Sequence, residues 1–302
     1  MIKMICHLMP WRDYLQLMRA DKPIGTLLLL WPTTWAIWLS GGEFVSSGWQ
    51  IGSFDPHVAV VFLIGVFLMR SAGCVINDFA DRHFDRHVER TKDRPLTAGR
   101  VSVFEALCLF FVLCFLALIC VLSLDDEVKY WVLIAAVPAV LIAILYPFMK
   151  RFFVTPQLVL GIAFSCGIPM AYLAQASPMN LGTLWLVFAN LAWVVAYDTI
   201  YALVDQDDDE TLGIFSSARF FGQQVNKIIA VLQIFTLIFL VLTGIYYSLN
   251  QFFYLILIAC SGFFVYQLFL IQGRRRDQCF IAFLNNAWFG GGVLLALIIG
   301  SQ

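Results

Sequence analysis

Residues 57–77 read HVAVVFLIGVFLMRSAGCVIN, and this stretch decides the fold. A helix needs about 20 mostly apolar residues to cross the hydrocarbon of a bilayer. The stretch has that length, and Arg70 is its one fully charged side chain, so it predicts a transmembrane helix. Its last residue, Asn77, opens a densely charged segment. The helix is therefore expected to deliver polar side chains to one surface of the membrane.

The same length rule, applied outward along the chain, predicts an all-α polytopic membrane bundle. Hydrophobic residues make up 61% of the 302 residues and charged residues 13%, whereas soluble domains carry about 25% charged residues. No separate soluble region remains, so residues 1–302 are expected to form one intramembrane domain. The predicted spans, about nine, are 24–41, 57–77, 103–124, 130–148, 157–175, 182–200, 228–248, 251–271 and 279–299.

The distribution of Lys and Arg predicts the orientation of these spans, because basic residues accumulate in cytoplasmic connections. With the N-terminus in the cytoplasm, all of the 19 Lys and Arg residues except Lys129 and Arg70 lie in connections on that side. Residues 1–22 are interrupted by charges and do not read as a cleavable signal. Their apolar side chains recur at helical spacing, so we expect this segment to lie along the cytoplasmic surface.

Two connections on the predicted cytoplasmic side, 78–102 and 201–227, are long and dense in both signs of charge. Long charged loops in a compact membrane protein are usually functional. The first begins with Asn77, Asp81 and Asp85, spaced i, i+4, i+8. If the helix continues out of its span, these side chains line one face.

The second connection repeats this arrangement. Asp205 and Asp209 are spaced i, i+4, and Asp198 precedes Asp205 by seven residues, as Arg70 precedes Asn77. At about 100° per residue these positions share one helix face. The repetition predicts two related halves with a site between them. Ionisable residues inside spans, such as Arg70 and Asp198, are costly and tend to be functional.

The two acidic clusters predict a Mg²⁺–diphosphate site. Mg²⁺ commonly takes one or two carboxylates together with phosphate oxygens of a substrate. Two facing carboxylate walls would repel a diphosphate unless a cation lies between them. Basic residues near the clusters are expected to contact the remaining phosphate oxygens; they are Arg82, Lys92, Arg94, Lys150 and Arg151.

Other interpretations of these residues stay open. His83 and His87 have the spacing of a zinc pair, although so many carboxylates favour magnesium. A secondary transporter would place ionisable residues deep in several spans. A CDP-alcohol phosphotransferase would carry its acids in one contiguous motif, whereas Asp81 and Asp205 lie far apart in this chain.

Four segments resemble the UbiA superfamily of intramembrane prenyltransferases, and within it the bacterial branch that acts on 4-hydroxybenzoate. The NDxxDRxxD motif at 77–85 and the YDTxYAxxDxxDD motif at 197–209 are long and specific. The resemblance covers nearly the whole chain. The segments that carry it are 21–33, 70–96, 146–151 and 197–213.

The resemblance implies a nine-helix bundle in the bacterial inner membrane, with a cavity on the cytoplasmic side that opens laterally to lipid. It implies Mg²⁺ held by both clusters, with the four aspartates acting as catalytic residues. The implied ligands are Asn77, Asp81 and Asp85 on one side and Asp205 and Asp209 on the other.

The resemblance also implies substrate contacts by residues around the clusters. Arg70, Asp198 and Tyr201 are expected to contact substrate, and Lys150 and Arg151 to contact either the diphosphate or the carboxylate of an aromatic acid.

The implied reaction joins a polyprenyl group from polyprenyl diphosphate to the ring of 4-hydroxybenzoate, an early step of ubiquinone biosynthesis. Metal and basic side chains stabilise the departing diphosphate, and the membrane keeps water away from the allylic cation. Homogentisate, dihydroxynaphthoate and haem are the alternative acceptors within the superfamily. Nucleic acid is not an expected partner.

Overall fold

The computed structural model describes residues 10–45, 48–52, 55–83, 85–87, 91–213 and 215–302. Most of these residues are helical, as the apolar runs predict. The helices are α2 (Pro10–Leu17), α3 (Ile24–Ser40), α4 (Pro56–Asp81), η2 (Asp85–His87), α5 (Val103–Leu122), α6 (Asp126–Met149), α7 (Pro156–Ser165), α8 (Gly167–Ala174), α9 (Leu181–Val204), α10 (Gln206–Leu212), α11 (Ser217–Phe221), η3 (Gly222–Gln224), α12 (Val225–Tyr246), α13 (Gln251–Leu270), η4 (Ile271–Gly273) and α14 (Arg276–Gly300).

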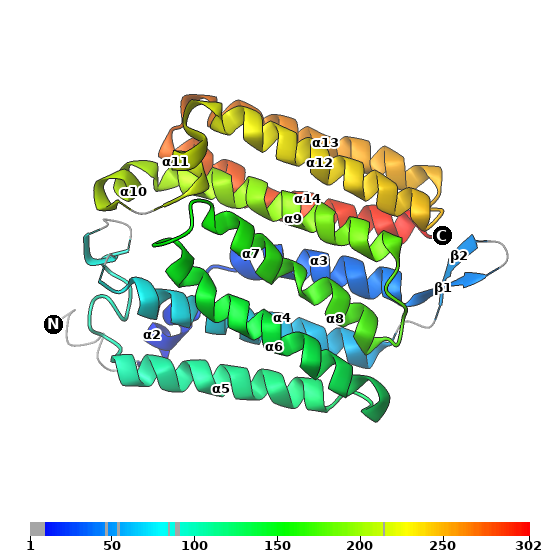
Figure 1. Cartoon of the computed structure of the whole chain (residues 1–302), viewed down its shortest axis with the longest axis horizontal. Helices are drawn as coiled ribbons and strands as arrows, with labels where there is room; N and C mark the ends of the chain where they lie inside the picture. Colours follow the sequence, from blue (N-terminus) through cyan, green and yellow to red (C-terminus); the bar gives the residue numbers. More distant parts are fainter. Residues whose placement is uncertain (1–9, 46–47, 53–54, 84, 88–90, 214) are drawn as a thin grey trace.

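The long helices lie side by side and run between the two ends of one bundle (Figure 1). Within the described part of the chain, eight helical stretches are long and apolar enough to cross a membrane. One of the eight joins α7 to α8, and α3 adds a shorter apolar helix of 17 residues. The prediction of an all-α polytopic bundle with about nine spans is therefore confirmed.

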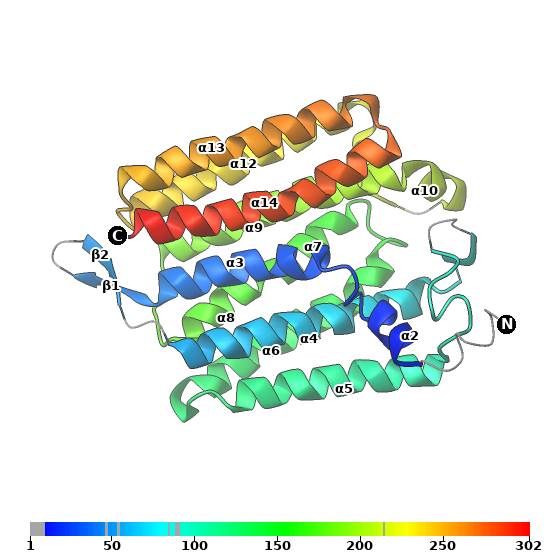
Figure 2. The ribbon, with the colours of Figure 1, turned by 180° about the vertical axis from the view of Figure 1, so that it is seen from behind.

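α9 forms the interior of the bundle and is the most buried of the eight spans. Trp193 of α9 stacks on Trp35 of α3, with ring centroids 5.2 Å apart. The indole Nε1 of Trp193 donates to Asn286 of α14 at 2.9 Å. α3 lies between α14 and α4 (Figure 2). These contacts fix the helix that carries the second acidic cluster.

α6, in contrast, is the least buried of the spans. Trp131, Ile134 and Val137 of α6 are exposed on the outside of the bundle, and we infer that they face lipid. Val132 of the same helix is fully buried. One helix therefore separates the interior from the lipid on this side.

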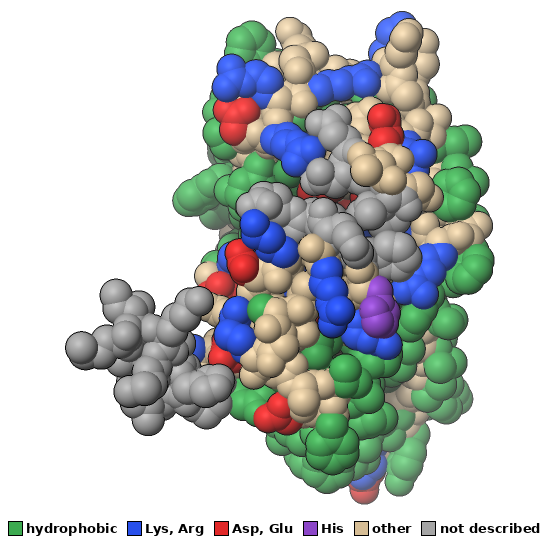
Figure 3. All heavy atoms as spheres, turned by 90° about the vertical axis from the view of Figure 1, so that its left-hand side faces the viewer, with side chains coloured by type: hydrophobic (Ala, Val, Ile, Leu, Met, Phe, Trp, Pro, Cys, Tyr) green, Lys and Arg blue, Asp and Glu red, His purple; other side chains and the backbone are tan. Residues whose placement is uncertain are grey.

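The two ends of the bundle differ in charge. Figure 3 views the end at which α10 lies, where Lys and Arg gather while hydrophobic side chains cover the flanks. At the other end a hairpin of β1 (Gly42–Val45) and β2 (Gly48–Ile51) pairs Glu43 with Gln50 in antiparallel register. The sequence predicts no strand in this connection. Which end faces the cytoplasm stays a prediction.

α2 is the helix predicted from the apolar spacing in residues 1–22, of which 1–9 lie outside the described part. Trp11 and Leu15 are exposed, whereas Leu17 is buried against α4. α2 lies near the α10 end of the bundle, whereas the C-terminus lies near the hairpin (Figure 1). The placement of α2 along a membrane surface stays a prediction.

Candidate active site

One cavity of about 1100 Å³ lies among α3, α4, α6 and α9 and receives side chains from both acidic clusters. The two clusters, which the sequence separates widely, therefore share one space. The roles predicted for their members stay predictions. The predicted site residues that line the cavity are Arg70, Asn77, Asp81, Asp85, Arg94, Lys150, Asp198, Tyr201, Asp205 and Asp209.

The first wall of the cavity comes from the end of α4. Asn77 and Asp81 lie one turn apart on this helix, as the sequence predicts, but α4 ends at Asp81. Asp85 lies in the separate 3₁₀ helix η2, so the expected helical face of three residues is wrong. Asp85 still reaches the cavity because Arg94 holds it there, with Nη1 donating to Oδ2 at 2.6 Å. Burial raises the pKa of the Asp85 carboxyl.

The second wall forms where α9 gives way to α10. Asp205 is the residue between the two helices, and its carbonyl accepts from the amide of Asp209 at 2.9 Å. Both side chains line the cavity. Burial raises the pKa of Asp209 to about 6, against an opposing effect of Lys150. A cation that binds here would relieve the cost of keeping these carboxylates charged.

Lys150 lies between the two walls. Its Nζ is 3.3 Å from Oδ2 of Asp81 on the first wall. The Asp81 carboxylate, followed more weakly by Asp209 and Asp198, raises the pKa of Lys150 against the effect of burial. The ammonium group therefore interacts with acids of both walls, and without metal it supplies part of the positive charge that they need.

Asp78 is a buried carboxylate beside this site to which the sequence assigned no role. Its Oδ1 accepts from Arg19 at 2.5 Å and from Arg94 at 3.1 Å. Because it follows Asn77 by one residue, it points to a different face of α4. It joins the segment after α2, the end of α4 and the loop after η2.

Three predicted basic residues, Arg82, Lys92 and Arg151, do not line the cavity. Arg82 donates to the carbonyl of Phe79 at 2.6 Å, and Arg151 donates to the carbonyl of Ala80 at 2.7 Å. Both arginines therefore cap the C-terminal carbonyls of α4, where positive charge is favourable. Lys92 is exposed. The position of these three side chains does not support the phosphate contacts expected of them.

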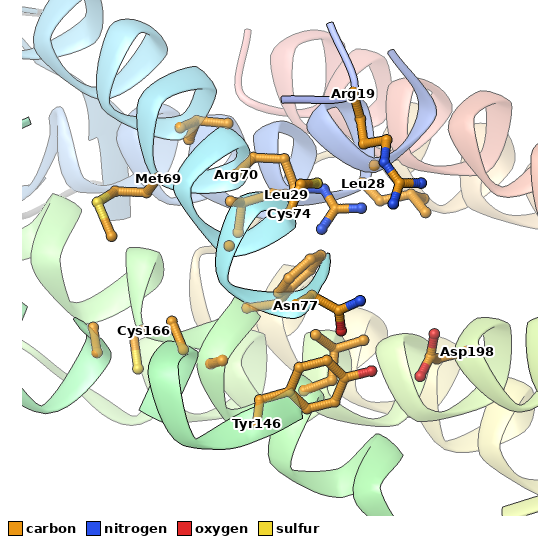
Figure 4. A pocket seen from close by; sticks show the side chains of 18 of the residues that line it. Arg19, Leu28, Leu29, Met69, Arg70, Cys74, Asn77, Tyr146, Cys166 and Asp198 are labelled. Atoms are coloured by element: carbon orange, nitrogen blue, oxygen red, sulfur yellow. The ribbon is translucent and has the colours of Figure 1, made fainter. Parts of the chain in front are cut away.

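Polar groups also line the cavity below the walls, and of these Arg70 and Asp198 lie about two helical turns from Asn77 and Asp205. Arg70, Asn77, Tyr146 and Asp198 all point into one space (Figure 4). The hydroxyl of Tyr197 also lies here, buried and without a hydrogen-bond partner among the described residues. No role was predicted for Tyr146 or Tyr197, because an aromatic residue in an apolar span usually packs in the core.

The rest of the cavity is apolar and extends away from the walls between α4, α5 and α6. Tyr201, which also lines the cavity, packs its ring against Phe283 with centroids 4.7 Å apart. The apolar lining includes Met69, Ala117, Val121, Val132, Ala136 and Val140.

The donor atoms of the two walls suit Mg²⁺ better than zinc. Among the described residues, no three His, Cys, Asp or Glu side chains converge closely enough to hold a metal alone. Mg²⁺ needs only one or two carboxylates when substrate phosphate and water complete its shell, so the walls fit a metal that binds together with a diphosphate. His83 is exposed, and the side chain of His87 lies outside the described part of the structure. The zinc alternative therefore gains no support.

Comparison with known sequences identifies the protein family of this chain. A family model described as the UbiA prenyltransferase family matches residues 29–290. The chain is 50% identical to the 4-hydroxybenzoate octaprenyltransferase of Aeromonas salmonicida (strain A449) over 95% of this chain and 94% of that protein. It is 49% identical to the enzyme of the same name from Haemophilus ducreyi (strain 35000HP / ATCC 700724), over 95% and 99%.

Solved structures have the same fold. A UbiA homolog from Aeropyrum pernix K1 superposes with a TM-score of 0.74 at 22% identity, over 89% of this chain and 97% of that one. A UbiA homolog from Archaeoglobus fulgidus, solved bound to GPP and Mg²⁺, superposes with a TM-score of 0.68 at 17% identity, over 95% and 99%. At these identities the likeness concerns the fold alone.

Proposed function

Because the chain belongs to the UbiA prenyltransferase family, we propose that it transfers a polyprenyl group from a polyprenyl diphosphate to the ring of 4-hydroxybenzoate. One observation carries the proposal: a single cavity joins two facing acidic walls to a long apolar compartment. The walls suit a metal-bound diphosphate, and the compartment suits a prenyl chain. A secondary transporter has no need of this combination.

We assign Mg²⁺ to the two walls of the cavity. Arg94 donates to Oδ2 of Asp85 and holds this carboxylate at the cavity. Bound Mg²⁺ supplies positive charge that neutralises the departing diphosphate. The UbiA homolog solved with GPP and Mg²⁺ supports this assignment. The proposed ligands are Asn77, Asp81, Asp85, Asp205 and Asp209.

In the reaction, the C–O bond between the allylic carbon and the diphosphate breaks, and both electrons leave with the diphosphate. The ring carbon ortho to the hydroxyl of 4-hydroxybenzoate forms the new C–C bond. Its hydrogen leaves as a proton, which the released diphosphate takes up. The products are 3-polyprenyl-4-hydroxybenzoate and diphosphate.

The side chains of this protein hold and shield the reacting groups. Lys150 interacts with acids of both walls, and its positive charge also stabilises the negative charge of the departing diphosphate. The apolar lining from α4, α5 and α6 takes the prenyl chain and excludes water that would quench an allylic cation. We place the protein in the bacterial inner membrane with its α10 end toward the cytoplasm.

The test is an assay of the protein in lipid vesicles with octaprenyl diphosphate, 4-hydroxybenzoate and Mg²⁺. We expect 3-octaprenyl-4-hydroxybenzoate by mass spectrometry, its loss in EDTA and its return when Mg²⁺ is restored. Homogentisate, dihydroxynaphthoate and haem are offered in parallel reactions. Faster prenylation of any of these three would overturn the proposed acceptor.

Substitution of one acid on each wall tests the metal assignment. Asp81→Ala and Asp205→Ala are each expected to abolish turnover while the protein still inserts, because each wall then loses a carboxylate ligand. Asp126→Ala is the matched control, since that carboxylate is 87% exposed and lies at the start of α6, outside the cavity. Normal turnover in Asp81→Ala or Asp205→Ala would remove the metal assignment.

A further inference from the structure

Ser216 is a buried serine at the second acidic wall for which no role was predicted. It lines the cavity and is the N-cap residue of α11. A serine at an N-cap usually accepts a hydrogen bond from the first turn of its helix. Here the side chain makes no such bond, and its buried Oγ has no partner among the described residues. Because buried polar atoms without partners are rare, this hydroxyl is available to a ligand in the cavity.

The backbone fixes Ser216 at the level of the acidic walls. The amide of Phe215 donates to the carbonyl of Lys150 at 3.1 Å, so the segment before α11 is tied to the turn that carries Lys150. Burial raises the pKa of Asp209, and the nearby Ser216 hydroxyl opposes this effect. The contact between them does not have the geometry of a hydrogen bond. The hydroxyl therefore lies beside the carboxylate and stays unbonded.

Gln157 supplies a second neutral donor next to this segment. It is the second residue of α7, and its side chain lines the cavity and is only 5% exposed. Its Oε1 accepts from the backbone amide of Ser217 at 2.9 Å. Because only the oxygen of a side-chain amide can accept, this bond fixes which way the amide points. Its Nε2 forms no hydrogen bond among the described residues, so two uncharged donors reach the cavity from neighbouring positions.

We propose that Ser216 and Gln157 donate hydrogen bonds to oxygens of the prenyl donor's diphosphate; this rests on the proposed function. The carboxylates of the walls can only accept, whereas phosphate oxygens need donors. Uncharged donors meet this need without adding a positive charge that would repel Mg²⁺. Hydrogen bonds to an oxygen strengthen as negative charge develops on it. The pair therefore also favours departure of the diphosphate when the C–O bond breaks.

The test measures the binding of inorganic diphosphate at saturating Mg²⁺ by isothermal titration calorimetry, so it does not depend on turnover. Ser216→Ala should raise the Kd for diphosphate at least about tenfold, because it removes a hydrogen bond to a charged group. Ser216→Thr keeps the hydroxyl and should bind within about threefold of wild type. In the transfer assay, Ser216→Ala should raise the KM for the prenyl diphosphate and change that for 4-hydroxybenzoate less than about twofold.

Two further variants keep the test independent of folding defects. Ser217→Ala is the matched control, because the Ser217 hydroxyl is bonded to Thr199 at 2.7 Å and does not line the cavity. This variant should leave the Kd for diphosphate unchanged. Gln157→Glu keeps the oxygen that the Ser217 amide needs but replaces the Nε2 donor by an acceptor. It should weaken diphosphate binding by more than about tenfold.

The outcomes separate this inference from the proposed function. If Ser216→Ala or Gln157→Glu binds diphosphate as tightly as wild type, the inference is wrong. It is also wrong if Ser217→Ala weakens binding as much as Ser216→Ala, because the effect then comes from the packing of the segment. A change in the KM for 4-hydroxybenzoate alone would equally overturn it. If wild type binds diphosphate with Mg²⁺ but transfers no prenyl group to 4-hydroxybenzoate, the proposed function itself fails.

Discussion

The charge of Lys150 bears on the stability of the site when no metal is bound. Its ammonium group lies 3.3 Å from Asp81 and interacts with Asp209 on the other wall. Lys150→Met removes that charge, so the acids repel each other more strongly. We expect the melting temperature in EDTA to fall by at least about 2 °C. Because Mg²⁺ then relieves more repulsion, its stabilising shift should be larger in the variant than in wild type.

Lys227→Met is the control for this measurement, because Lys227 is an exposed lysine outside the cavity. Its melting temperature in EDTA and its shift with Mg²⁺ should match those of wild type. An unchanged shift in Lys150→Met would contradict the position of Lys150 between the walls.

Single residues were predictable to different degrees. The i, i+4 spacing located Asn77, Asp81 and the second pair, because a helix face follows directly from spacing. Arg82 and Arg151 were expected to contact substrate, and in the structure they bind carbonyls at the end of α4. Sequence places a charge near a site but does not show which of two nearby partners its long side chain reaches.

At the scale of elements, the end of α4 is held by Asp78. This carboxylate is fully buried and binds Arg19 at 2.5 Å and Arg94 at 3.1 Å. Asp78→Asn leaves the partly buried Arg19 without its anion and Arg94 paired with Asp85 alone, and breaking a buried ion pair costs about 3–5 kcal/mol. We expect the melting temperature to fall by at least about 5 °C, measured by thermal unfolding in detergent.

Asp13→Asn is the matched control, because its partner Arg100 is one-third exposed, and a pair of this kind contributes under about 1 kcal/mol. Equal shifts in the melting temperature for the two variants would show that Asp78 does not anchor α4.

The elements show why the sequence predicted the spans better than their ends. Apolar runs of sufficient length set the spans, and the structure has them. The end of α4 depends on ion pairs with Arg19, 59 residues away, and Arg94, 16 residues away. Such pairs leave no local pattern, so the expected continuation of the helix to Asp85 was wrong. The β1–β2 hairpin was missed because it is short.

At the scale of the whole molecule, the asymmetry of charge predicts how the bundle sits in the membrane. Lys and Arg gather at the α10 end, and the hairpin lies at the other end (Figures 1 and 3). Basic connections are retained in the cytoplasm. The cavity walls, at the ends of α4 and α9, then open where a water-soluble aromatic acid can arrive, while the prenyl chain enters from lipid.

Labelling of single cysteines tests this orientation. In a background without other cysteines, Glu43→Cys on the hairpin and Arg86→Cys beyond α4 both introduce an exposed thiol. In intact cells, a maleimide that does not cross membranes should label Glu43→Cys and leave Arg86→Cys unlabelled, because the inner membrane shields the cytoplasmic end. In inverted inner-membrane vesicles the pattern should reverse. If both cysteines react from the same side, the two ends do not lie on opposite faces of the membrane, and the acidic walls lose their proposed access to the cytoplasm.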